Sequence, residues 1–153
     1  AACCACGAAA AGGDQETVDR MWGLGERVGL AFQIQDDLLD LGEGDRTGKP
    51  TGQDIRERKM TLPLIHTLAK ASPSERRRLI KLVKHKSEDP AAVKEVMDAI
   101  LAGPGMERAR SEMRRLKEEA LTMLDELGGD EAVSTEARDA LRDLIEYTIR
   151  RVK

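Results

Sequence analysis

Acidic residues gather in the stretch Phe32-Gln33-Ile34-Gln35-Asp36-Asp37-Leu38-Leu39-Asp40. If this stretch forms a continuous helix, Asp36 and Asp40 lie on one face and Asp37 lies about 100° around the axis. Carboxylates this close repel one another, and a divalent cation relieves the repulsion. Oxygen ligands favour Mg²⁺ or Ca²⁺ over zinc or copper, and Mg²⁺ usually takes one or two carboxylates together with phosphate oxygens. The pattern therefore predicts a metal site that faces a phosphorylated substrate.

A glycine-rich segment follows the acids and contains Gly42, Gly44, Gly48 and Gly52. These glycines predict that the acidic helix ends near Leu41 and leads into a polar loop. The cations Lys49 and Lys59 flank this loop and could contact phosphate oxygens directly, as lysines often do. Together the acids and lysines favour a site for a diphosphate. The competing interpretation is a solvated acidic helix end followed by an ordinary linker.

The same residues carry a family resemblance. The segments Phe32-Gln33-x-x-Asp36-Asp37-x-x-Asp40, Gly48-Lys49-x-x-Gly52-x-Asp54 and Lys59-x-Thr61-Leu62-Pro63 resemble the second aspartate-rich motif of the trans-isoprenyl diphosphate synthases, the polyprenyl synthetase family. The resemblance implies an all-α fold, a helical bundle of the isoprenoid synthase type. In such a bundle two aspartate-rich motifs face one another across a central cavity.

The resemblance also implies roles for single residues. Asp36 would be the main Mg²⁺ ligand on this half, with Asp37 and Asp40 as further ligands or as partners of the ligands. Lys49 and Lys59 would contact the diphosphate and count with Asp36 as catalytic residues. The remaining implied substrate-binding residues, which would orient the substrate, are Phe32 and Gln33. The implied reaction is the Mg²⁺-dependent condensation of an allylic diphosphate with isopentenyl diphosphate.

The chain also departs from the family pattern. Members carry an earlier Asp-Asp-x-x-Asp motif and an upstream Lys-Thr pair, and neither occurs in these 153 residues. By resemblance, Ala1 would fall just after that pair. We therefore expect residues 1–153 to form a single α-helical domain that is the C-terminal half of a synthase. We also expect negligible prenyl transfer by the chain alone, and assembly either into a dimer or larger homo-oligomer or with the missing N-terminal half.

Three other functions are compatible with the sequence. The chain could be a non-catalytic regulatory or scaffold subunit of a heteromeric prenyl diphosphate synthase. It could be a relative of the cyclising terpene synthases, although the Gly48-Lys49 and Lys59 elements fit elongating synthases better. It could also be a helical interaction module without a metal-dependent role.

Composition supports a helical protein. Hydrophobic residues make up 41% of the chain, charged residues 35% and aromatic residues only 2%, a mixture that favours helices over sheet. The net charge of −3 argues against a nucleic-acid partner. The chain has no apolar run of about 18 residues and no signal-like start, so we predict a cytoplasmic protein without a membrane span.

Local signals predict most helix boundaries. Side chains typical of N-caps precede four apolar periodic runs, and these caps are Asp14, Ser72, Asp89 and Ser134. Asp54 is expected to cap a helix that begins near Ile55, with Glu57 three residues on completing a capping-box pattern. Pro63 either kinks that helix or marks a new start. Steps of three and four between apolar residues predict one long helix from Gly105 to Leu127. The wide apolar stripe of the helix after Asp14, which includes Trp22, predicts that this helix is mostly buried. The closely spaced Cys3, Cys4 and Cys6 are expected to be reduced packing residues.

Overall fold

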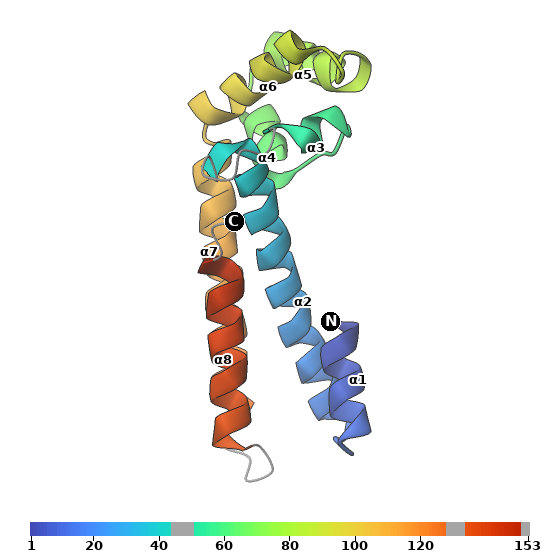
Figure 1. Ribbon diagram of the computed structural model, residues 1–153, viewed down its shortest axis with the longest axis vertical. Coiled ribbons are helices and arrows are strands. Elements are labelled where there is room, and N and C mark those ends of the chain that lie inside the picture. Colours follow the sequence, from blue (N-terminus) through green and yellow to red (C-terminus); the bar gives the residue numbers. More distant parts are fainter. Residues whose placement is uncertain (44–50, 128–133, 151–153) are drawn as a thin grey trace. The chain divides into compact units, whose positions relative to one another are not determined.

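The computed structural model describes residues 1–43, 51–127 and 134–150, and every regular element in these ranges is helical (Figure 1). The all-α prediction is therefore confirmed. Eight α-helices and one π-helical turn, η1, follow one another in the order α1 (Ala2–Ala10), α2 (Gln15–Leu38), η1 (Leu39–Glu43), α3 (Gln53–Arg56), α4 (Leu62–Lys70), α5 (Pro73–His85), α6 (Pro90–Ala102), α7 (Gly105–Glu126) and α8 (Thr135–Arg150). Among the described residues, no helix combines the length and the apolar character needed to cross a membrane.

The four predicted side-chain caps are all present. The Asp14 carboxylate accepts a hydrogen bond from the Thr17 amide at 2.8 Å. The side chains of Ser72, Asp89 and Ser134 likewise accept from backbone amides in the first turns of α5, α6 and α8. Each acceptor satisfies one of the amides that the first turn of a helix leaves without a partner.

The chain divides into two compact units. Of the described residues, unit 1 comprises 1–33, 112–127 and 134–150, and unit 2 comprises 34–43 and 51–111. Both units draw on α2 and α7, whose two ends belong to different units. The prediction of a single domain stays a prediction.

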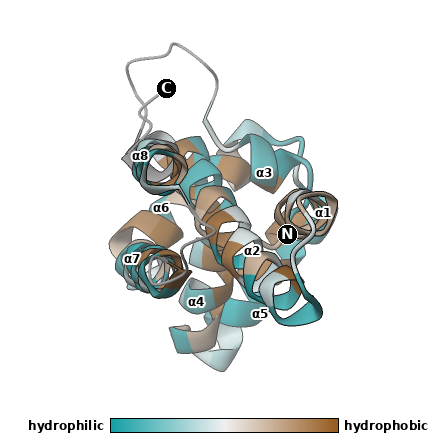
Figure 2. Ribbon diagram, turned by 90° about the horizontal axis from the view of Figure 1, so that it is seen from below, coloured by the Kyte–Doolittle hydropathy of each residue, from teal (hydrophilic) through white to brown (hydrophobic). Residues whose placement is uncertain are grey.

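Unit 1 is built from α1, α8 and the adjoining parts of α2 and α7. Its core consists of small and branched apolar side chains, among them Leu24, Ala31, Leu116, Ala120, Leu124 and Ile145. Three of these residues come from the periodic stripe that predicted α7, and α7 and α8 carry both hydrophobic and hydrophilic residues in Figure 2. Of the three cysteines, Cys4 packs against Gly25, whereas Cys3 and Cys6 are exposed, so the packing prediction was wrong for those two.

Unit 2 carries the end of α2 and the short helices that follow it. The helices α3, α4 and α5 all contact α6. The buried apolar residues between them include Ile55, Leu64, Leu79, Val83, Val96 and Ile100. This packing fixes α3 and α4, which follow the acidic stretch directly in the chain.

Gly105, the first residue of α7, lies directly against α4. A Cβ atom at this position would lie 2.2 Å from the Pro63 carbonyl oxygen and 2.3 Å from Thr67 Oγ1. The Thr67 hydroxyl donates to that same carbonyl at 2.9 Å, so neither atom can move aside without losing this bond. In contrast, a Cβ atom at Gly29 in α2 would meet no atom within 4 Å.

We expect Gly105→Ala to lower the free energy of unfolding by about 1–3 kcal/mol, because the added methyl overpacks the contact with α4. The matched substitution Gly29→Ala should raise the free energy of unfolding by up to about 1 kcal/mol, since alanine stabilises an exposed helical position more than glycine does. Urea denaturation followed by far-ultraviolet circular dichroism measures both. Equal effects of the two substitutions would contradict the close approach at Gly105.

Candidate functional site

The acidic stretch lies at the junction between α2 and η1. Asp36 and Asp37 belong to the last turn of α2, whereas Asp40 lies in the π-helical turn that follows. A π-helical turn contains more residues than an α-helical turn, so the premise that Asp40 continues a regular α-helix one turn after Asp36 was wrong. Gly42 ends the helical path with a φ of 105°. The predicted helix end near Leu41 is confirmed to within a few residues.

Asp40 holds the start of α3. Its Oδ1 accepts a hydrogen bond from the Gln53 amide and its Oδ2 accepts one from the Asp54 amide, both at 3.0 Å. The Asp40 backbone carbonyl also accepts from the Gly52 amide at 2.8 Å. Burial raises the pKa of the Asp40 carboxyl, although the two amide hydrogen bonds oppose this rise. Asp40 thus joins the end of the acidic stretch to residues 52–54.

The predicted cap of this helix was wrong. α3 begins at Gln53, after Gly52, and its N-terminus receives no hydrogen bond from the side chain of its own N-cap residue. Asp54 lies inside the helix. Gly52 has a φ of 78°, and a Cβ atom there would lie 2.8 Å from Met97 Sδ, so both the backbone and the contact with α6 require glycine.

Asp37 performs a similar task at α4. Its side chain is buried, and its Oδ2 accepts a hydrogen bond from the Leu62 amide at 3.3 Å. Leu62 is the first residue of α4, and the N-cap residue Thr61 makes no side-chain cap. Pro63 follows at the second helical position, so it marks a new helix start rather than a kink.

Lys59 lies between α3 and α4 and faces two carboxylates. Its Nζ lies 2.9 Å from Asp54 Oδ1 and 2.7 Å from Glu57 Oε2. The hydrogen bonds that the Lys59 ammonium donates to the carboxylates of Glu57 and Asp54 raise the pKa of Lys59 above its usual value. Because the Lys59 side chain is 57% exposed, its charge also remains open to solvent.

The other predicted site residues are placed as follows. Phe32 is half-buried and Gln33 is exposed, and both belong to unit 1, whereas the acids and Lys59 belong to unit 2. Lys49 lies outside the described residues. Within unit 2, hydrogen bonds bring Asp40, Asp54 and Lys59 together and tie Asp37 to the start of α4.

Sequence reasoning did not assign Asp54 and Glu57 as partners of Lys59. It treated both acids as parts of a local cap, because they stand where a capping box would place them. Their spacing of five and two residues before Lys59 was the available signal. The backbone amides of Gln53, Asp54 and Leu62 could not be identified as partners, since backbone donors have no residue-type signature.

The carboxylate oxygens of the acidic stretch are the kind of ligand that Mg²⁺ prefers. Within the described ranges, no group of three or more acidic, histidine or cysteine side chains could hold a metal ion. The described residues therefore form no closed cage of three or more such ligands. Mg²⁺ does not require such a cage, because it typically takes one or two carboxylates from a protein and completes its shell with water and phosphate oxygens.

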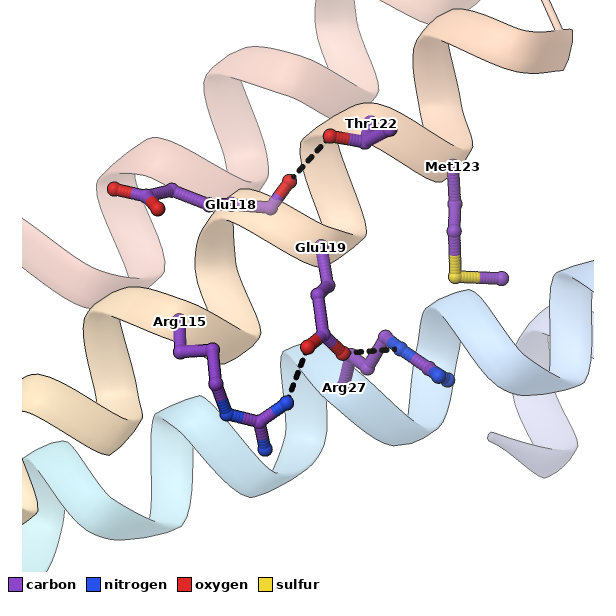
Figure 3. Close-up of a pocket in the computed structure, with 6 residues that line it drawn as sticks. All are labelled: Arg27, Arg115, Glu118, Glu119, Thr122 and Met123. Atoms are coloured by element: carbon purple, nitrogen blue, oxygen red, sulfur yellow. Dashed lines mark hydrogen bonds and ion pairs between the residues drawn. The ribbon is translucent and has the colours of Figure 1, made fainter.

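A hollow in unit 1 is a weaker candidate for an anion site. It has a volume of about 350 Å³, and Figure 3 shows its lining, which comes from α2 and α7: Arg27, Arg115, Glu118, Glu119, Thr122 and Met123. Arg27 Nε donates to Glu119 Oε2 at 3.0 Å, and Arg115 pairs with Glu119 and with Glu112. Because carboxylates already neutralise both arginines, the hollow offers little attraction to a phosphate.

Comparison with known proteins gives a consistent result. The family model described as polyprenyl synthetase matches residues 1–100. The chain is 36% identical over 144 residues to the nonaprenyl diphosphate synthase of Mycobacterium tuberculosis, and the match covers 92% of this chain and 40% of that relative. The curated relative is thus more than twice as long as the matched region.

Solved structures give the same fold. A geranylgeranyl pyrophosphate synthase from Bacteroides thetaiotaomicron superposes with a TM-score of 0.84 at 29% identity, covering 98% of this chain and 48% of that one. A geranylgeranyl pyrophosphate synthase from Corynebacterium glutamicum, complexed with calcium and isoprenyl diphosphate, gives a TM-score of 0.72 at 30% identity and covers 92% and 42%. This chain, with its all-α fold and its acidic stretch at the end of α2, therefore belongs to the polyprenyl synthetase family of trans-prenyl diphosphate synthases.

Proposed function

We propose that this chain supplies one side of the active site of a prenyltransferase of isoprenoid biosynthesis. The enzyme would condense an allylic diphosphate with isopentenyl diphosphate. The observation that carries the proposal is the placement of the acids at the end of α2 in the same compact unit as Lys59, a lysine whose ammonium is held and still exposed. Membership in the polyprenyl synthetase family supports the reaction class.

In this reaction the carbon–oxygen bond of the allylic diphosphate breaks, the double bond of isopentenyl diphosphate attacks the allylic carbon, and a proton is lost. Mg²⁺ would supply positive charge where the leaving diphosphate becomes more negative. Asp36 would be the main ligand of that ion on this side, with Asp37 and Asp40 as further ligands or hydrogen-bonded supports. The calcium and isoprenyl diphosphate in the Corynebacterium glutamicum structure support a divalent ion beside a diphosphate.

Lys59 and Lys49 would contact the diphosphate, while Phe32 and Gln33 would orient the substrate. For Lys59 the ion pairs explain how an exposed ammonium keeps one position. Asp54, with a side chain only 16% exposed, holds one side of the ammonium, and Glu57, at 44%, holds another. A diphosphate carries more charge than Glu57 and would compete for the ammonium from the solvent side.

Exposed apolar residues in unit 1 support assembly with another polypeptide or with a further part of a synthase. α2 was predicted to be mostly buried, yet Trp22 and Leu30 are 49% and 50% exposed. On α8, Leu144 and Tyr147 are 56% and 67% exposed. Since the chain spans less than half of its relatives, we propose that these residues pack against a partner that carries the other aspartate-rich motif. The predicted dimer would use the same faces, and the cytoplasmic location stays a prediction.

We expect Asp36→Asn to weaken Mg²⁺-dependent binding of an allylic diphosphate by roughly tenfold or more, because even partners of metal ligands contribute that much to affinity. Calorimetric titration of geranyl diphosphate with and without Mg²⁺ measures this. Asp98→Asn is the matched control, since Asp98 lies on α6 in the same unit and pairs with Lys94. A helical wild-type sample that binds no diphosphate, or equal losses in both variants, would contradict the proposal.

We expect the chain alone to show negligible prenyl transfer and to gain activity when mixed with the part of the nonaprenyl diphosphate synthase relative that this chain does not match. Trp22 is the single tryptophan, so its emission should shift to shorter wavelength when the exposed face becomes covered. Asp36→Asn should keep the emission shift and lose the transfer, which separates assembly from chemistry. Long-chain product from the unmixed chain would refute this prediction.

A further inference from the structure

Asp37 and Asp40 of the acidic stretch both bind backbone amides. Asp40 accepts from the Gln53 and Asp54 amides at the start of α3, and Asp37 accepts from the Leu62 amide at the start of α4. Lys59 lies in the short segment between these two helices. The segment that carries Lys59 is therefore tied at both ends to one turn of the acidic stretch.

We infer that Asp37 and Asp40 are positioning residues, which hold the starts of α3 and α4 and thereby fix Lys59. The inference rests on the proposed function, since it assigns Lys59 to the diphosphate. It also separates Asp37 and Asp40 from direct metal ligation, a distinction that the motif alone does not make.

Electrostatics also favour a positioning role for Asp37 and Asp40 over metal ligation. Amides at a helix start present the positive ends of their dipoles, and here those ends point at both oxygens of Asp40 and at Oδ2 of Asp37. A divalent cation at the same oxygens would face this positive charge. Ligation by these oxygens would also weaken the charge-assisted hydrogen bonds that α3 and α4 receive there.

The two helix starts depend on these acids, because neither helix receives a cap from its own N-cap side chain. α3 is a single turn of four residues, and such a turn does not persist without outside contacts. Asp54, whose carbonyl accepts from the Lys59 amide at 2.8 Å and whose carboxylate binds Lys59 Nζ, belongs to that turn. Displacement of α3 would therefore displace Lys59.

The backbone beside Lys59 adds to this dependence. Arg58 has a φ of 60°, a left-handed conformation that residues other than glycine adopt at a cost. Its Nε donates to the buried Ser87 Oγ at 3.1 Å. A strained residue keeps its conformation only when the surrounding contacts hold it, and here the contacts on the α3 side begin with Asp40.

Amide hydrogen exchange, measured by NMR on the ¹⁵N-labelled chain, tests the positioning role. Asp40→Ala should speed exchange at both the Gln53 and Asp54 amides by roughly tenfold or more, the effect of losing a hydrogen bond to a charged acceptor. Asp40→Asn should restore protection at one of the two, since a carboxamide has one acceptor oxygen. Asp37→Ala should speed exchange at the Leu62 amide, because it removes the acceptor of that hydrogen bond.

The controls separate local from general effects. Exchange at Leu79 and Val83, buried in the same unit, should stay unchanged in all these variants. Asp143→Asn, at an exposed position on α8, should leave every one of these amides unchanged. Unchanged exchange at Gln53 and Asp54 in Asp40→Ala, or equal acceleration at Leu79 and Val83, would overturn the inference.

Binding then separates a positioning residue from a ligand, with Mn²⁺ and inorganic diphosphate as probes. Asp36→Asn should weaken Mn²⁺ binding at least tenfold, whereas Asp40→Ala should change it less than twofold. Asp40→Ala should weaken diphosphate binding as Lys59→Met does, with no further loss in the double variant. Additive losses, or loss of Mn²⁺ with Asp40→Ala, would overturn the inference. A wild-type chain that binds neither probe would overturn the proposed function, and the exchange rates would still decide whether the acids hold the two helices.

Discussion

The starts of α3 and α4 need hydrogen-bond acceptors that their own sequences do not provide. The first amides of a helix have no partner within the helix, and leaving such donors without acceptors in a packed region is costly. Gly52 has no side chain to offer, and Thr61 makes no cap. The acceptors come instead from Asp40 in η1 and from Asp37 at the end of α2. The placement of α3 and α4 therefore depends on the position of the acidic stretch.

The same hydrogen bonds from backbone amides also reduce the repulsion among the carboxylates of the acidic stretch. Three carboxylates within five residues carry like charges that repel one another. The amide dipoles at the starts of α3 and α4 place positive charge beside Asp40 and Asp37. For Asp40, burial still raises the pKa of the carboxyl despite its two amide hydrogen bonds. Lys59 adds a positive charge on Asp54, which otherwise acts on Asp40 as a second negative charge.

Sequence reasoning identified those parts of the fold that depend on neighbouring residues. The helix starts at Asp14, Ser72, Asp89 and Ser134 could be predicted because each cap lies within three residues of the amide that it binds. The long helix α7 could be predicted because its apolar residues recur with the helical period. Helix content and the acidic motif are both local properties of the chain.

The prediction of the α3 cap failed because the acceptor is distant in the sequence. Its acceptor, Asp40, lies 13 and 14 residues before the amides that it binds, and a nearer acid, Asp54, stood at a position where caps often occur. The π-helical turn had the same effect on the acids, because it breaks the regular spacing on which their shared face was inferred. Exposure of Trp22 was missed because an apolar stripe predicts a contact without identifying the partner that makes it.

A single Mg²⁺ ion usually takes only one or two carboxylates from a protein, so three closely spaced acids exceed what one ion on this side requires. On our inference, the acids that the ion does not require, Asp37 and Asp40, hold neighbouring helices in place. Asp37 and Asp40 hold the starts of the two helices between which Lys59 lies, and under the proposed function Asp36 would bind the metal. The segment that carries the proposed diphosphate-binding lysine is thereby tied to the acidic stretch that would bind the metal. Preorganisation of this kind is what a site needs when it must stabilise charge on a departing diphosphate.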